Sequence, residues 1–132
     1  MVERLNLSRV SKDGSFSMYG IVLGTKQIGE IGVSQDKDAI HMEFVELDPK
    51  YRGQGYYQKA LNLLIKRNPQ CKYFSGEASN KRVLHAANKV FGSPKAVEGD
   101  IDSLPEDASY RADGTIESDK SVLVRWDRPK ED

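Results

Sequence analysis

Residues 44–57 read FVELDPKYRGQGYY, and this stretch decides how the rest of the chain is interpreted. A run of β-forming residues ends at Leu47, and Gly53 and Gly55 then precede a helical pattern of apolar residues. Glycine lets backbone N–H groups approach an anion closely, and a helix N-terminus adds a partial positive charge. The stretch therefore predicts a strand, a diphosphate-binding turn and a helix in succession.

Two common phosphate-binding motifs do not fit this turn. A P-loop requires Gly-Lys-Ser/Thr after the glycines, and that sequence is absent. The dinucleotide fingerprint requires a third glycine, where Gln58 stands. The turn is therefore expected to hold a diphosphate in a different fold.

The N-terminal third alternates apolar and polar residues between short turn signals, which predicts strands at residues 5–10, 16–23, 28–33 and 40–47. The loops between these segments are too short for a parallel crossover, so the four strands should form an antiparallel meander.

After the glycine turn, apolar residues recur at helical spacing over 57–65, and Asn68-Pro69 stops the run. A short strand is predicted over 71–78, followed by a second helix that Ser79 can cap and Gly92 ends. The order of these elements makes residues 40–47 and 72–75 parallel neighbours. The expected fold is α/β, with a mixed twisted sheet: an antiparallel meander, a βαβα unit and a C-terminal strand.

Length and composition predict one domain over residues 1–132, because 38% hydrophobic content suffices for one core. Its core should span about 15–97, and its last strand 121–126. Residues 98–120 show no periodicity and are long for a loop, which indicates a functional flap or disorder. Without a signal peptide, a membrane span or a second cysteine beside Cys71, the chain is expected to be cytoplasmic and metal-free.

Formal net charge is zero, but residues 48–89 carry nine basic residues against Asp48 and Glu77. The positive field of this segment would attract either a phosphorylated cofactor or a nucleic acid.

The sequence LDPKYRGQG at residues 47–55 resembles the acyl-CoA-binding motif of the GNAT (amine N-acetyltransferase) superfamily, Arg/Gln-x-x-Gly-x-Gly/Ala. The predicted elements of residues 27–92 also follow that family's order. The resemblance implies that the backbones of Val45 and Leu47 pair with the pantetheine arm of acetyl-CoA, and that Asn80 matches the Asn of the family's second motif. It further implies that the diphosphate is bound by Arg52, Gly53, Gln54, Gly55, Tyr56 and Tyr57.

The chain departs from the family pattern at four places, one of which is that the family's usual Gly-Phe after the second helix is reversed here as Phe91-Gly92. Tyr57 stands where the motif ends in Gly or Ala, and Ala87 stands where many members have a tyrosine that protonates the leaving thiolate. The two helices that usually follow the first strand have no room before Phe16. An open acceptor groove follows, suited to a large substrate or to completion by a partner chain.

N-acetyl transfer needs a base, because the amine attacks the thioester directly. Alternation along 40–47 predicts that Glu43 shares a face with His41, Val45 and Leu47. Glu43 and Glu77 are the candidate bases, with Glu46 and His41 in reserve, and Tyr110 is the candidate proton donor to the thiolate. For Glu43 and Glu46 a structural ion pair is the alternative, and for Glu77 it is a loop carboxylate.

The sequence thus predicts transfer of an acetyl group from acetyl-CoA to an amine acceptor, which can be a protein. The sequence leaves open whether the protein forms a homodimer. The first alternative is a non-catalytic module of the same fold that binds CoA or a protein partner. The second is a nucleic-acid-binding protein that uses the basic segment 50–89, where Tyr51, Tyr56 and Tyr57 lie among basic residues.

Overall fold

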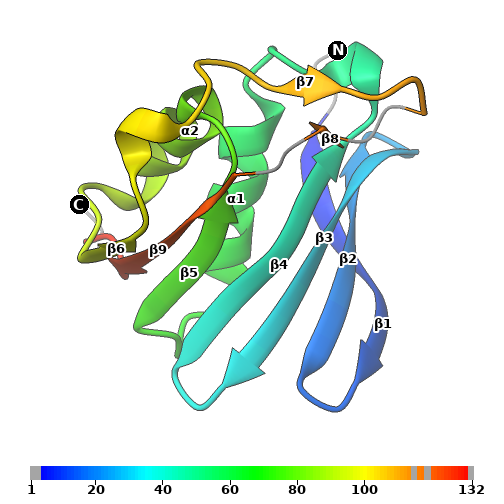
Figure 1. Cartoon of the computed structure of the whole chain (residues 1–132). Helices are drawn as coiled ribbons and strands as arrows, with labels where there is room; N and C mark the ends of the chain where they lie inside the picture. The colour runs from blue at the N-terminus through cyan, green and yellow to red at the C-terminus, as the bar shows by residue number, and fades with distance from the viewer. Residues whose placement is uncertain (1–3, 114–115, 118–119, 131–132) are drawn as a thin grey trace.

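The computed structural model describes residues 4–113, 116–117 and 120–130. Its main sheet has seven strands in the order β1-β2-β3-β4-β5-β9-β6 (Figure 1). The strands are β1 (Leu5–Asp13), β2 (Phe16–Leu23), β3 (Lys26–Asp36), β4 (Ala39–Leu47), β5 (Tyr73–Ala78), β6 (Ala96–Glu98) and β9 (Val122–Asp127). A separate pair consists of β7 (Ser109–Tyr110) and β8 (Ile116–Glu117).

The predicted meander of β1 to β4 is confirmed, because all three pairs in it are antiparallel. Each of its hairpins closes through a loop of two residues, since the last pairs are Asp13 with Phe16, Leu23 with Lys26, and Asp36 with Ala39. Such short loops fix the strand register without long-range contacts.

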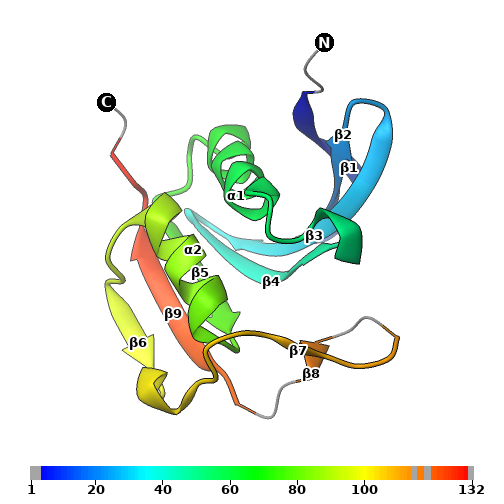
Figure 2. The same cartoon turned by 90° about the horizontal axis from the view of Figure 1, so that it is seen from above.

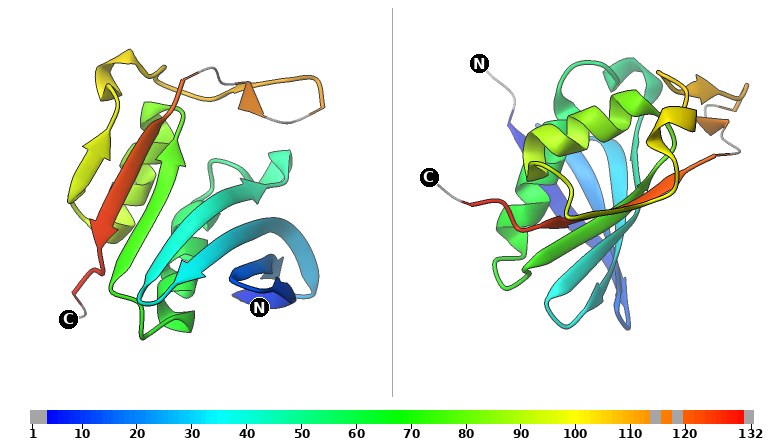
Figure 3. Two further views of the ribbon diagram at one scale, coloured as in Figure 1. Left: turned by 60° about the horizontal axis from the view of Figure 1, so that its bottom comes forward. Right: turned by 60° about the vertical axis from the view of Figure 1, so that its left-hand side comes forward.

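The predicted βαβ crossover is also confirmed. A 3-10 helix, η1 (Pro49–Tyr51), leads from β4 into α1 (Tyr56–Arg67), and the chain returns as β5, which is parallel to β4. The two strands pair only from Ala39 to Met42 on β4 and from Tyr73 to Gly76 on β5. Beyond this short register they diverge, and the last five residues of β4 have no partner on that side (Figure 3). We call this diverging region the splay.

Both helices lie on one face of the sheet (Figure 2). Helix α2 (Lys81–Phe91) packs on β5 and against α1, which in turn contacts β1. The core lies between them, with Leu61, Leu64 and Phe74 fully buried. Phe91 stacks on Trp126 at 4.9 Å between ring centroids, and the Trp126 indole N–H donates to the Asn88 side chain. No helix of the described chain covers the opposite face, which we call the open face.

A β-bulge in β4 corrects the predicted alternation. Met42 pairs with Val33 and Phe44 pairs with Gly32, so Glu43 is an extra residue between them. The Glu43 carboxylate accepts a hydrogen bond from the Ser34 hydroxyl at 2.7 Å. Val45 and Leu47, in contrast, pack against the buried core on the helix side. The prediction that Glu43 shares a face with Val45 and Leu47 was therefore wrong.

Two further expectations need correction. Helix α2 is capped by Asn80 and not by Ser79, because the Asn80 side chain accepts a hydrogen bond from the Val83 N–H at 2.9 Å. The stretch expected to be aperiodic contains η2 (Ile101–Ser103), β7 and β8, and the edge strand β6 precedes it. The last strand is where it was predicted, within one residue at each end.

Candidate functional site

The glycine turn forms a concave group of backbone donors at the start of α1. Gly53 and Gly55 have φ values of 74° and 86°, which is the left-handed region that glycine adopts without strain. Turns of this kind direct successive N–H groups to one point and bind anions. The described chain offers no hydrogen-bond acceptor to the N–H groups of Gly53, Gln54 or Gly55.

The space in front of this turn is open. A Cβ at Gly55 would meet no atom within 4 Å, and one at Gly53 would meet only the Arg82 Nη2, at 3.5 Å. Helix α1 has no side-chain cap and no acidic residue in its first turn. Its N-terminal dipole therefore adds to the donors of the turn, and the residues present fit an anionic group such as a diphosphate.

Arg52 anchors the turn to the end of β4. Its Nε donates to the Leu47 carbonyl at 2.9 Å, and its guanidinium lies 4.1 Å from the centroid of the Tyr110 ring. The structure thus brings Tyr110 to the glycine turn, where its side chain is about half exposed at 45%. Gln54 faces back along the chain and donates to the Lys50 carbonyl.

The two tyrosines that open α1 point to different places. Tyr57 is half-buried against the core, and burial raises the pKa of its phenol to about 12. Its ring therefore leaves the phosphate-binding space free, although Gly or Ala is usual at this position of the motif. Tyr56 packs edge-to-face on Tyr51, and the Lys59 ammonium lies 5.6 Å from its ring centroid.

The splay gives β4 an unpaired backbone edge beside the turn. The Asp48 N–H bonds to the Ile28 carbonyl, so the even-numbered residues at this end of β4 pair with β3. Val45 consequently directs its N–H and C=O into the splay. Leu47 does so too, but its carbonyl already accepts the Arg52 hydrogen bond.

Glu43 and Glu77 come from the two strands that border the splay, and both are exposed. On β5, Phe74 and Ala78 are buried toward the helices, which places Glu77 on the open face by alternation. Glu43 lies on the same face because of the bulge. The structure therefore brings the two candidate bases to one side of the sheet, where the splay begins. His41 lies just below them and is hydrogen-bonded through Nδ1 to the Ser75 hydroxyl at 2.8 Å.

A segment that the sequence analysis did not place, residues 104–110, crosses the N-terminus of α2, and we call it the strap. The carbonyls of Pro105 and Glu106 accept hydrogen bonds from the N–H groups of Lys81 and Arg82. The side chains pair in the same order. The Lys81 ammonium lies 3.1 Å from a Glu106 carboxylate oxygen, and the Arg82 guanidinium lies 2.9 Å from an Asp107 carboxylate oxygen. A hydrogen bond from the Ala108 N–H, together with the Arg82 guanidinium, lowers the pKa of the Asp107 carboxyl.

The strap explains why only one of the two helix N-termini is available to a ligand. Asn80 and the strap carbonyls satisfy the first donors of α2, whereas those of α1 and its glycine turn stay open. The buried Asn80 side-chain oxygen is engaged in this cap. In the sequence, the only sign of the strap is the acidic pair at 106–107, which complements the basic pair at 81–82.

Comparison with known proteins shows which fold this is. No protein-family model and no curated protein sequence matches this chain. Among solved structures, a Bacillus subtilis acetyltransferase in complex with CoA matches 94% of this chain and 99% of its own, with a TM-score of 0.68 at 10% identity. A GNAT family acetyltransferase from Elizabethkingia anophelis with acetyl-CoA bound matches 97% and 98%, with a TM-score of 0.62 at 11% identity.

A third match is a ribosomal-protein-alanine N-acetyltransferase from Escherichia coli, which has a TM-score of 0.63 at 14% identity and covers 92% of this chain and 74% of its own.

In the described residues, no helix is long and apolar enough to cross a membrane, and no group of His, Cys, Asp or Glu side chains is placed to hold a metal ion. The matches to solved structures show that the chain has the fold of the GNAT acetyltransferases.

Proposed function

We propose that this protein binds acetyl-CoA and transfers its acetyl group to an amine. The observation that carries the proposal is the open set of N–H donors at Gly53, Gln54 and Gly55, which lies at the N-terminus of α1 and beside the splay. A diphosphate needs such donors, and an extended pantetheine arm needs an unpaired strand edge like that of Val45. The matched structures that hold CoA or acetyl-CoA support the same cosubstrate.

The chain's own residues would divide the work as follows. The turn and the α1 dipole hold the diphosphate, Arg52 fixes the turn to β4, and the backbone edge of Val45 orients the arm. Bound acetyl-CoA supplies a thioester carbonyl that the amine attacks directly. Glu43 or Glu77 accepts the amine proton, because both carboxylates lie on the open face beside the splay.

Tyr110 remains the candidate proton donor to the thiolate. Its ring contacts the Arg52 guanidinium, which is bonded to the Leu47 carbonyl at the end of β4, and this contact supports the assignment.

The direct test of the base uses Gln variants of the two carboxylates. If one is the base, Glu43→Gln or Glu77→Gln should retain acetyl-CoA affinity in calorimetry and lose on the order of 100-fold in turnover. Glu98→Gln, an exposed carboxylate on β6, is a matched control that should keep full activity. Full turnover in both variants would eliminate Glu43 and Glu77 as the base and leave Glu46, His41 or bulk water.

One observation favours the non-catalytic alternative. Ala87 is buried in α2, so the position that carries a tyrosine in many relatives here fills the core. A protein that binds acetyl-CoA in calorimetry and acetylates no amine in a panel of lysine peptides, N-terminal peptides and small amines would establish this alternative.

The nucleic-acid alternative is weakened by where its basic residues lie. Lys81 and Arg82 pair with the strap, and Arg67 donates to the Leu7 carbonyl and lies over the Tyr19 ring. Binding to DNA or RNA that falls steeply with added salt would revive it.

A further inference from the structure

The open face of β2 to β4 carries an apolar floor. Phe16, Met18 and Phe44 are half-buried there and do not belong to the core between the sheet and the helices. The rings of Phe16 and Phe44 meet over Gly32, and a Cβ at this glycine would collide with the Phe44 ring. Gly32 thus leaves room for both rings against the sheet, and Phe16 and Phe44 remain partly exposed.

Carboxylates surround this floor. Glu30 and Glu46 lie directly opposite each other on β3 and β4, next to the bulged Glu43, and Glu77 lies across the splay. Like charges in direct cross-strand register destabilise a sheet. The strands around Glu30 and Glu46 supply little compensating charge, because β2, β4 and β5 contain no lysine or arginine and β3 contains only Lys26, at its first position. The arginine on β9, Arg125, lies opposite Ser75 and over the Tyr73 ring. Gln27 is the one described hydrogen-bonding partner of Glu30, at 3.4 Å.

The negative field on this face is local, since the formal net charge of the whole chain is zero. A ligand with positive charges would relieve the repulsion between Glu30 and Glu46, and the methylene groups of its basic side chains could cover the aromatic rings. Adjacent strands lie about 4.8 Å apart, so a patch that extends from β2 to β5 is about 14 Å wide. That width suits several residues of an extended chain.

We propose that the open face binds a cationic peptide, in which basic side chains flank the amine to be acetylated. This inference rests on the proposed function, because it names the acceptor of the same site. The basic flanks would lie over the apolar floor and the pair of Glu30 and Glu46. The target amine would then reach the splay, where Glu43 and Glu77 stand.

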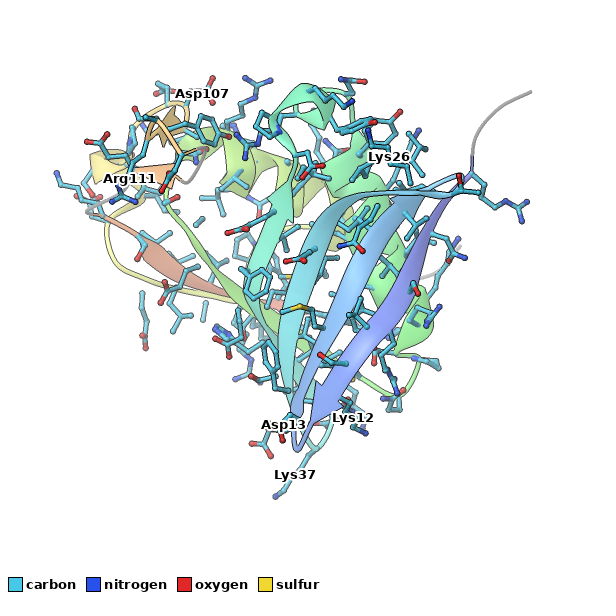
Figure 4. The ribbon with its side chains drawn as sticks, turned by 90° about the vertical axis from the view of Figure 1, so that its right-hand side faces the viewer. Lys12, Asp13, Lys26, Lys37, Asp107 and Arg111 are labelled. Atoms are coloured by element: carbon cyan, nitrogen blue, oxygen red, sulfur yellow. The ribbon has the colours of Figure 1, made fainter. Side chains whose placement is uncertain are left out.

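The test measures peptide binding without acetyl-CoA, by fluorescence anisotropy of labelled peptides with one central lysine. A peptide with arginines on both sides of that lysine should bind at least tenfold more tightly than the same peptide with serines. Glu30→Gln combined with Glu46→Gln should remove that preference. Asp13→Asn should keep the preference for the arginine peptide, because Asp13 lies at a distant hairpin tip. Figure 4 shows this tip at the opposite end of the molecule from Asp107.

The double variant also guards against misfolding as an explanation. Because it removes a like-charge pair, its melting temperature should equal or exceed that of the unmodified protein. Equal affinity for the arginine and serine peptides would overturn the inference, as would equal losses in the Asp13 variant. Spermidine that displaces the labelled arginine peptide as effectively as the peptide itself does would also overturn the inference, in favour of a small polyamine as the ligand.

The inference and the proposed function can fail separately. A protein that prefers the arginine peptide but transfers no acetyl group retains the inferred surface and loses the enzymatic role. A protein that acetylates the serine peptide as efficiently as the arginine peptide retains the role and loses the inferred acceptor.

Discussion

Replacing Gly55 by Asp and, separately, by Asn separates the charge requirement of the glycine turn from its shape. Both side chains tolerate the left-handed φ of 86° better than other residues. A Cβ here meets no atom within 4 Å, so neither substitution creates a clash. The strain should be about 1 kcal/mol in each variant, and the two proteins should unfold at nearly the same temperature.

The two variants differ by one negative charge in front of the donors. A carboxylate about 5 Å from a doubly charged diphosphate costs about 1.7 kcal/mol at the dielectric constant of water, which is about a 17-fold loss of affinity. Gly53, Gln54 and Gly55 are exposed, so the effective dielectric constant there is close to that of water and a loss of this order is expected. The Asn variant should lose much less, since it adds no charge.

Isothermal titration with acetyl-CoA at low ionic strength measures both affinities directly. The difference between the Asp and Asn variants should shrink as salt is added, because the repulsion is screened. If both variants bind acetyl-CoA as the unmodified protein does, the diphosphate lies elsewhere and the assignment of the turn is refuted. An equal loss in both would mean that shape, and not charge, limits binding.

Other contacts predict further outcomes. Burial raises the Tyr57 pKa to about 12, so the neutral phenol stabilises the fold fully below pH 10, and that contribution is lost as the pH rises to 12. Between pH 9 and 12, the free energy of unfolding in urea should fall by roughly 2 to 3 kcal/mol less in Tyr57→Phe than in the unmodified protein. Equal falls in the two proteins would contradict this account. Asp107→Asn releases Arg82 beside the glycine turn and should tighten acetyl-CoA binding by up to about fivefold in calorimetry at low salt; unchanged affinity would mean that the strap does not compete. Asn80→Ala removes the hydrogen bond to the Val83 N–H and should cost about 1 kcal/mol in urea unfolding, whereas Ser79→Ala should cost little.

Local patterns in the sequence were enough to predict the meander, α1 and the glycine turn. Two-residue loops and a 3.6-residue helical period depend only on residues close in sequence, so both can be predicted without knowledge of tertiary contacts. The parallel pairing of β4 and β5 followed from the handedness and length of the crossover.

Features that depend on contacts distant in sequence were missed. The bulge at Glu43 has no local signal, because it is defined only by the register with β3, where Val33 pairs with Met42 and Gly32 pairs with Phe44. Strand β6 has three exposed residues and exists only because β9 offers it an edge. The strap joins residues 25 apart in sequence, so its charge complementarity becomes visible only once α2 is placed.

The candidate site was predicted in part for that reason. The turn residues and the strand edge at Val45 come from one continuous stretch of chain. Tyr57 was expected at the phosphates, but its ring packs into the core, because the helical period that begins at the turn directs it there. The proximity of Tyr110 to Arg52 depends on the strap and could not be inferred from periodicity.

The short register between β4 and β5 also has a consequence for how the chain folds. Strands β1 to β4 form one unit from local hairpins, whereas β5 must wait for β9, which is separated from it by residues 79–121. Bringing the ends of this long connection together is entropically costly, so the meander should form early and the unit of β5 and β9 late. Only four residue pairs join the two units across the sheet. A ligand seated in the splay would therefore act as a clamp between them, and the amides it slows most in hydrogen exchange should be those of β5 and β9.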